Sequence, residues 1–366
     1  MDLDRNGLLS LYKTMTTIRH FEERGIPETG QRGMSASVHS SAGQEAVPTG
    51  MCANLSNEDY IGSTHRGHGH CIAKGVDPKL MMAELFGRAT GPNKGKGGSM
   101  HISDMSKGML GTNGVVGASI PLAVGAALTS KLRNFGRVAV AFFGDGAVEE
   151  GTFHESMNFA SLMKLPTIFV CENNFYSSHL NLLERRAKDN IIESSTLHGM
   201  PGHSVDGNNV FDVLAATKAA VRKARRGGGP SFIECRTYRW HGHVGPSWDM
   251  DVGVKRKSEL EVWRKKDPLL IVKRALLSNG LPETVIGSLN QTAEAEVAAE
   301  AEAEAAAEVE AEAEAAAQAE AEAEAAEPDT TKPIISPPAD LIIEATGSFT
   351  SVNLGEAMAM DEMVFN

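Results

Sequence analysis

The chain has 366 residues, of which 42% are hydrophobic and 22% charged, and its formal net charge is −12. This length and composition allow a large buried core, and the lack of a basic stripe argues against nucleic-acid binding. No apolar run approaches the roughly 18 residues that a membrane-spanning helix needs, and no signal-peptide core is visible, so no membrane association is expected.

The negative charge is concentrated in residues 293–327, which contain 13 Glu and neither Lys nor Arg. The rest of the chain has 34 acidic and 35 basic residues, so the body is close to neutral. The four cysteines are scattered without the spacing of a metal site, which is typical of reduced thiols and predicts a cytoplasmic protein.

The predicted elements begin with an amphipathic helix over residues 8–25, whose apolar residues recur at helical spacing. A helix rich in small residues is expected over 114–132, suited to tight packing in the core or against a partner. Short apolar, β-rich runs predict buried strands, and a further helix is expected over 210–227. The alternation of strands and helices predicts an α/β fold over residues 1–285, with a doubly wound, mainly parallel sheet.

A strand, a helix and a second strand follow one another over residues 137–172, which predicts a right-handed βαβ unit with parallel strands. Asp145 follows the first strand and Asn174 follows the second, so both should lie at the carboxyl edge, where open parallel sheets bind ligands. Carboxylate and amide oxygens suit Mg²⁺, and the glycines around Asp145 let the backbone approach a diphosphate. The pattern predicts a metal–diphosphate clamp, and the alternative is a surface turn followed by a chance Asn-Asn pair.

The Gly-Asp-Gly turn followed by Asn-Asn resembles the signature of thiamine-diphosphate enzymes. Over roughly residues 8 to 270 the chain resembles the alpha subunit of the pyruvate, branched-chain 2-oxoacid and acetoin dehydrogenases. Several further blocks occur in that family's order, namely SSAGQEAV, HRGHGH, MAELFGRATG, GKGGSMH, TNGVVGASIPLAVGAAL and TYRWHGHVG. The resemblance implies the thiamine-diphosphate-binding fold, with thiamine diphosphate and Mg²⁺ as cofactors.

The resemblance also implies a role for individual residues around the cofactor. Metal ligation would come from Asp145, Asn174 and the carbonyl of Tyr176. The other cofactor contacts would be made by Arg66, Gly146 and Ala147 at the diphosphate, by His65 where the pyruvate enzymes commonly carry tyrosine, by Gly114 and Val116 at the aminopyrimidine, and by His241.

The histidines carry the catalytic expectations. His241 matches a histidine that lies near the diphosphate and assists acyl transfer, and His39 matches a substrate-pocket histidine. Val244 stands where the mammalian pyruvate enzyme has a regulatory serine, so regulation by that phosphorylation is not expected. Zinc binding by the HRGHGHC block is an alternative, although no second cluster completes the site. His70 is interpreted as a solvated loop residue.

As implied by the family, the chain would be the alpha subunit of an oxidoreductase that decarboxylates pyruvate or a related 2-oxo acid and transfers the acyl group to a lipoyl arm. Its partners would be a beta subunit, in an α2β2 assembly, and a lipoyl-bearing acyltransferase core. Two alternatives stay open: an acetoin (acyloin) dehydrogenase alpha subunit, and a non-catalytic assembly subunit. GKGGSMH lacks the spacing of a phosphate loop and is expected to form a glycine-rich wall beside the site.

The C-terminal part departs from the family. The Ala/Glu-rich segment has self-repelling glutamates and no obvious apolar stripe, so it is expected to be a solvated, partly helical spacer. With the Pro-rich stretch that follows, it forms an expected spacer over residues 286–340. Residues 341–366 resemble the opening of the family's beta subunit, which would make the chain the front of an alpha–beta fusion.

Overall fold

The computed structural model describes residues 3–25, 38–245, 248–249, 253–254 and 256–325. The resemblance of residues 341–366 to a beta subunit therefore falls outside the described residues. The chain divides into two compact units, Met1–Glu312 and Ala313–Asn366. Of the second unit, residues 313–325 are described, and they are helical. The predicted domain limits at residues 285 and 340 stay predictions.

The centre of the first unit is a six-stranded sheet in which every neighbouring pair is parallel. The strands in spatial order are β2 (Met109–Gly111), β1 (Tyr60–Gly62), β3 (Ala139–Gly144), β4 (Thr167–Asn173), β8 (Ser231–Arg236) and β7 (Gly202–Asp206). A separate antiparallel ribbon pairs β5 (Tyr176–Ser177) with β6 (Leu180–Asn181).

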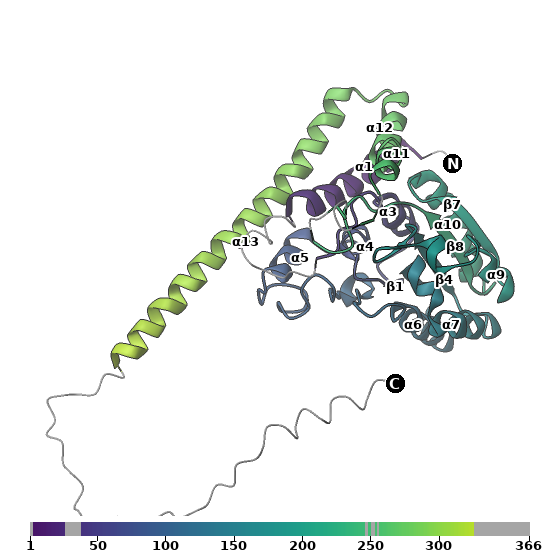
Figure 1. The fold of residues 1–366 in the computed structure, drawn as a ribbon, viewed down its shortest axis with the longest axis horizontal. Coiled ribbons are helices and arrows are strands. Elements are labelled where there is room, and N and C mark those ends of the chain that lie inside the picture. The colour runs from purple at the N-terminus through teal and green to yellow at the C-terminus, as the bar shows by residue number, and fades with distance from the viewer. Residues whose placement is uncertain (1–2, 26–37, 246–247, 250–252, 255, 326–366) are drawn as a thin grey trace, which may run out of the picture. The chain divides into compact units, whose positions relative to one another are not determined.

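Helices cover both faces of the sheet, as the prediction of a doubly wound fold requires (Figure 1). Alternate residues of β3 enter different cores: Val140 and Phe142 belong to one hydrophobic cluster, and Ala141 and Phe143 to the other. The first cluster includes side chains of α1 (Arg5–His20), α3 (Ala46–Cys52), α4 (His68–Lys74), α5 (Pro78–Leu85) and α10 (Val210–Arg225). The second cluster includes those of α6 (Ser119–Arg133) and α7 (Gly151–Leu162), which lie side by side.

The remaining helices are short or lie toward the chain's C-terminal side. They are the π-helical turn η1 (Phe21–Gly25), the 3₁₀ turns η2 (Met105–Lys107) and η3 (Asp145–Glu149), and α8 (Leu182–Arg185), α9 (Glu193–Leu197), α11 (Lys257–Arg264), α12 (Pro268–Ser278) and α13 (Glu283–Ala325). Among the described residues, no helix is both long and apolar enough to cross a membrane.

The first helix forms where its pattern predicts. Asp4 caps it by accepting a hydrogen bond from the Gly7 amide at 2.8 Å, which satisfies one of the donors left free at a helix start. The expected apolar face is buried throughout, and it consists of Leu8, Leu11, Met15, Ile18 and Phe21.

Helix α13 differs from the expectation of a solvated spacer over its first turns. Ala293, Val297 and Ala301 are each at most 2% exposed. They recur every four residues, which places them on one face of a helix and forms a narrow apolar stripe. The sequence pattern hides this stripe because alanines occur on every face of the segment.

Candidate active site

A cavity of about 190 Å³ lies where the carboxyl ends of the central strands meet the loops that follow them. Eight of the residues expected to bind cofactor or metal line it: His65, Arg66, Val116, Asp145, Gly146, Ala147, Asn174 and Tyr176. Three other expected residues, His39, Gly114 and His241, are not part of this lining.

The βαβ unit brings the two halves of the predicted clamp together. Strands β3 and β4 pair in parallel, and Gly144 lies opposite Glu172. As a result the Asn174 amide donates a hydrogen bond to Asp145 Oδ1 at 3.3 Å, and Asn174 Oδ1 accepts one from the Tyr176 amide at 3.3 Å. Asp145 and Asn174 are both buried. Hard oxygen donors therefore converge at one point of the sheet edge.

Asp145 is a buried carboxylate whose main partner is a cation from outside the motif. Burial raises its pKa to about 6, and the nearby Arg185 opposes that rise. The Arg185 guanidinium pairs with the Asp145 carboxylate and also contacts Glu149 Oε1 at 2.5 Å. Sequence reasoning does not identify Arg185, because nothing in α8 marks it as a partner of Asp145. The site thus already accommodates positive charge beside Asp145.

Gly146 is required by close packing rather than by its backbone angles. A Cβ atom at this position would lie 2.6 Å from Ser177 Oγ and 3.0 Å from Ser177 Cβ, so Ser177 would have to shift to admit it. The glycine therefore lets the loop after β3 lie directly against the β5 ribbon, and both line the cavity.

Two buried arginines give the cavity region a positive potential. Arg66 donates to Ser40 O at 2.8 Å and to His243 O at 2.9 Å. Burial and the nearby Arg239 lower the pKa of Arg66 to about 9, and burial and Arg256 lower that of Arg239 to about 10. Burial thus disfavours the charge of both guanidiniums, which would favour an anionic ligand beside Arg66, whereas Arg239 Nη1 already lies 3.4 Å from Asp249 Oδ2. Arg239, which was not predicted from the sequence, lies outside the cavity lining but donates a hydrogen bond to the carbonyl oxygen of the lining residue Ser178 at 2.5 Å.

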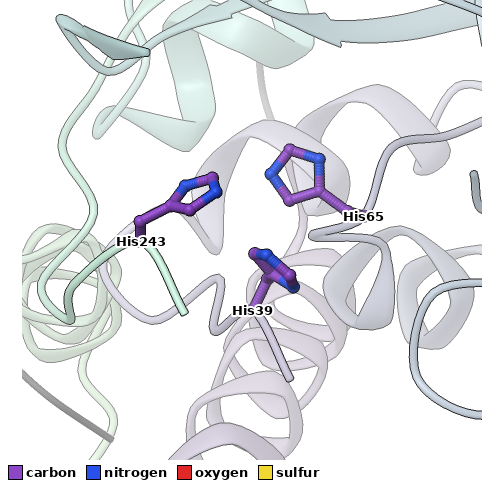
Figure 2. A group of neighbouring side chains, drawn as sticks. All are labelled: His39, His65 and His243. Carbon is purple, nitrogen blue, oxygen red and sulfur yellow. The ribbon is translucent and has the colours of Figure 1, made fainter. Parts of the chain in front are cut away.

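Three histidines from distant segments meet beside the cavity (Figure 2). The ring centroids of His39 and His65 are 4.6 Å apart, those of His39 and His243 5.0 Å, and those of His65 and His243 5.6 Å. Burial, followed by the charge of Arg66, lowers the pKa of His65 to about 2 and that of His243 to about 3. These two imidazoles are therefore neutral at physiological pH.

The placement of His243 changes the expectation for the HGH sequence. His243 lines the cavity, whereas the ring of His241 lies 4.6 Å from that of Trp248 and outside the lining. The family resemblance pointed to His241 as the histidine near the diphosphate, and the sequence does not show which of two histidines separated by a single glycine faces the cavity. Gly114 is likewise next to Met100 and His101 rather than in the lining.

The other histidines of HRGHGHC are structural. His68 lies between Glu22 Oε1 at 3.3 Å and Ser99 Oγ at 2.9 Å. His70 is buried rather than solvated, and its Nδ1 lies 2.9 Å from Ser63 Oγ. Within the described residues, the only group of three or more potential metal ligands is His39, His65 and His243. The zinc alternative for this block is therefore not supported by the structure.

The glycine-rich segment is held by an internal carboxylate. Glu84, which is fully buried, accepts hydrogen bonds from the backbone amides of Asn93 (2.8 Å), Gly95 (3.0 Å), Gly97 (2.7 Å) and Gly98 (3.3 Å). These amides form an anion-binding concavity of the kind that holds phosphates in other loops. Here Glu84 fills it, so the segment is a supported loop rather than a phosphate-binding one.

Comparison with known proteins identifies the family. Residues 13–323 match the dehydrogenase E1 component family. The chain belongs to the dehydrogenase E1 component family. The expected resemblance is confirmed, and the chain is an alpha subunit of a thiamine-diphosphate-dependent E1 oxidoreductase.

Among its relatives are two alpha subunits of acetoin:2,6-dichlorophenolindophenol oxidoreductase. The one from Bacillus subtilis is 46% identical over 277 residues, covering 76% of this chain and 83% of the relative. The one from Cupriavidus necator is 45% identical over 301 residues, covering 82% and 88%. The pyruvate dehydrogenase E1 component subunit alpha of Zymomonas mobilis is 39% identical over 298 residues, covering 80% and 83%.

Proposed function

We propose that this E1 alpha subunit acts on a 2-oxo acid such as pyruvate and transfers the resulting acyl group to a lipoyl arm on an acyltransferase core. The observation that carries the proposal is the convergence of Asp145 and Asn174 at the carboxyl edge of the sheet, beside the buried Arg66 and Arg239. A combination of hard oxygen donors and nearby guanidinium groups suits a metal-bound diphosphate.

The residues present fit Mg²⁺ and thiamine diphosphate. Asp145, Asn174 and the carbonyl of Tyr176 would hold the metal, and the raised pKa of Asp145 indicates that Arg185 only partly compensates the burial of this carboxylate, so a further cation would stabilise it. Arg66 and the amides of Gly146 and Ala147 would hold the diphosphate. Bound there, thiamine diphosphate supplies an electron sink for cleavage of the bond next to the substrate carbonyl.

The histidine cluster would suit proton transfer near the substrate once a diphosphate is bound, because the negative charge of that group would raise the pKa values that burial and Arg66 lower. His243 and His65 line the cavity, and His39 contacts both rings. A neutral imidazole can accept a proton at one nitrogen while donating a hydrogen bond from the other. We assign this role to His243 in place of His241, with His39 and His65 fixing its orientation.

The acid that activates the aminopyrimidine is proposed to come from a beta subunit. Glu149 is paired with Arg185, and the buried Glu45 accepts hydrogen bonds from Arg19 at 2.5 Å and from the Gly43 amide at 2.9 Å. Glu172 lines the cavity but lies 3.4 Å from His70 Nε2 at the end of β4. Glu149 and Glu45 are thus engaged in ion pairs outside the cavity lining, and Glu172 is the carboxylate besides Asp145 in that lining.

An exposed apolar surface offers a place for the second chain. Val116, at the cavity, is 50% exposed, Leu122 on α6 is 53% exposed, and Leu162 on α7 is 75% exposed. Exposed apolar side chains are typical of a surface that a partner covers, and two of these lie close in sequence, Val116 in the cavity lining and Leu122 in the first turn of α6. A beta subunit docked on this surface would also cover the cofactor, in an α2β2 assembly.

Acetoin or another acyloin is a second candidate substrate. The relatives named for acetoin are 46% and 45% identical to this chain, against 39% for the pyruvate dehydrogenase subunit described above. The retained site argues against the third alternative, a non-catalytic assembly subunit, because such a protein has no need of buried Asp145, Arg66 and Arg239.

The test is reconstitution with a beta subunit. The purified chain with Mg²⁺ and thiamine diphosphate should release no CO₂ from pyruvate or a branched 2-oxo acid, and no acetaldehyde from acetoin. Addition of a matching beta subunit should produce one of these products, and the product formed identifies the substrate class. Robust turnover by the chain alone would refute the two-chain proposal, and Glu172→Gln would then test the internal carboxylate.

A further inference from the structure

The three-histidine cluster has a second chemical capacity beyond proton transfer. His39, His65 and His243 each offer one ring nitrogen, and these three atoms all lie within 4.8 Å of one another. Three imidazoles on a tetrahedral zinc ion, with bonds of about 2.0–2.1 Å, have nitrogen atoms about 3.3–3.4 Å apart. Small side-chain rotations would therefore bring all three nitrogens into coordinating range.

We propose that His39, His65 and His243 form a binding site for a divalent transition-metal ion such as Zn²⁺, distinct from the Mg²⁺ position, and that its occupation inhibits the enzyme. Three imidazoles are the ligand set of open zinc sites, in which a fourth position is left to water or an anion. His65 and His243 line the cavity, so the fourth position would face the space that substrate needs.

The Mg²⁺ position has a different chemistry. Asp145, Asn174 and the Tyr176 carbonyl are oxygen donors, which Mg²⁺ prefers, whereas imidazole nitrogens select Zn²⁺, Cu²⁺ or Ni²⁺. The proposed ion would thus not compete for the Mg²⁺ ligands. Binding alone tests the site, so the result does not depend on which substrate the enzyme uses.

Two neighbours limit the affinity. Arg66 Nη2 lies 3.3 Å from His243 Nδ1 and 2.9 Å from His243 O. We expect His243 to bind metal through Nε2, so that its proton is on Nδ1. The contact between Nδ1 and Arg66 would then be lost, whereas the hydrogen bond from Arg66 to the His243 carbonyl would remain. The positive charges of Arg66 and Arg239 also oppose a dication, so binding should be weaker than in closed structural zinc sites.

The experiment uses the full chain without an affinity tag, freed of metal with a chelator that is then removed. A separate pair, His154 and His198, has ring nitrogens 3.1 Å apart near the surface and could add weak background binding, so all variants are made in a His198→Gln background. Zn²⁺ affinity is measured by calorimetry, and Co²⁺ is used as a spectroscopic probe because tetrahedral and octahedral Co²⁺ absorb with very different intensity.

We expect one Zn²⁺ per chain and an intense, tetrahedral Co²⁺ spectrum. His39→Gln, His65→Tyr and His243→Gln should each weaken Zn²⁺ binding by more than the roughly 10–100-fold cost of losing an outer-shell partner. The control His203→Gln changes an exposed histidine on β7 and should leave binding unchanged. With the beta subunit present, Zn²⁺ inhibition should be reversed by chelation and reduced in His65→Tyr.

Equal Zn²⁺ affinity in the three variants and the control would overturn the proposal, as would an octahedral Co²⁺ spectrum. Circular dichroism of each variant establishes that it is folded, so that lost binding is assigned to the lost ligand. If one variant does not fold, the two others still decide the outcome, because each removes one of the three ligands.

Discussion

The backbone amide of Asn174 donates a hydrogen bond to Asp145 Oδ1 over 3.3 Å, although the two residues are separated by an entire helix and strand. This bond ties the loop after β3 to the loop after β4. It keeps the Asp145 carboxylate directed toward the cavity, where a metal ligand would be needed.

Asp145→Asn should abolish Mg²⁺-dependent binding of thiamine diphosphate while the fold is retained. The amide keeps the size of the side chain but removes the negative charge that Mg²⁺ requires. Because burial already raises the pKa of Asp145, loss of its charge should not destabilise the chain. Calorimetry measures the cofactor affinity, and Asp212→Asn at an exposed helix start is the control. Unchanged affinity in Asp145→Asn would refute the clamp.

His243→Gln should reduce acyl transfer by about 10²-fold or more in the enzyme reconstituted with a beta subunit, the usual contribution of a positioned acid or base. His241→Gln should have a much smaller effect, because its ring lies against Trp248 and outside the cavity. The opposite ranking of the two variants would restore His241 to the catalytic role.

Glu84→Gln should destabilise the glycine-rich loop. The glutamine has one acceptor oxygen in place of two, and its amide group would face backbone N–H donors, so about 1.5–3 kcal/mol of stability should be lost. Hydrogen exchange of the amides of residues 93–98 should accelerate. Glu261→Gln, at an exposed position, provides the comparison. Equal exchange rates in both variants would show that Glu84 does not support the loop.

Docking of α13 should weaken as the pH rises. Burial, with the negative charges of Asp77 and Glu296, raises the pKa of Glu300 to about 7, while Lys79 lowers it. Because the pKa is raised in the folded state, the contribution of neutral Glu300 is present at about pH 4.5 and is lost as the pH rises toward about 7. Protection of the amides of residues 293–301, corrected for intrinsic exchange, should therefore be greater at pH 5.5 than at pH 8.

Glu300→Gln should remove this pH dependence, since the amide does not ionise. Glu302→Gln, at an exposed position on the same helix, should retain it. If both variants keep the pH dependence, another group controls the docking of α13. If wild-type protection does not change between the two pH values, the titration of Glu300 has no consequence for the helix.

The first turns of α13 should contribute to the stability of the body. Val297→Ala should lower the free energy of unfolding by about 1–3 kcal/mol, because Val297 is 1% exposed. Val285→Ala on the same helix, at 44% exposure, should change it by less than about 0.5 kcal/mol.

Truncations extend the same test to the whole stripe. Ending the chain after residue 312 should leave the melting temperature unchanged, whereas ending it after residue 285 should lower it, because the second truncation removes Ala293, Val297 and Ala301. Equal melting temperatures for the two truncations would favour the original expectation of a spacer that the body does not need.

The sequence by itself determined the central βαβ unit and the meeting of Asp145 with Asn174. Both depend on local signals: apolar runs that define strands, a helix between them, and polar residues at the strand ends. A parallel pairing of neighbouring strands then places the two residues at one edge whatever the rest of the fold does. The family resemblance added Arg66, His65 and His39, which the structure places in or beside the cavity.

Only the tertiary structure decided which loop residues face the cavity and which charges surround it. Arg66 meets His243 across 177 positions of sequence, and Arg185 meets Asp145 across 40, so no local pattern reports either contact. The direction of His243 as opposed to His241 depends on these long-range bonds, because a loop has no fixed periodicity. The burial of α13 was also decided by the tertiary structure. The alanines of this helix are alike in sequence, so only the surface against which the helix packs decides which of them become buried.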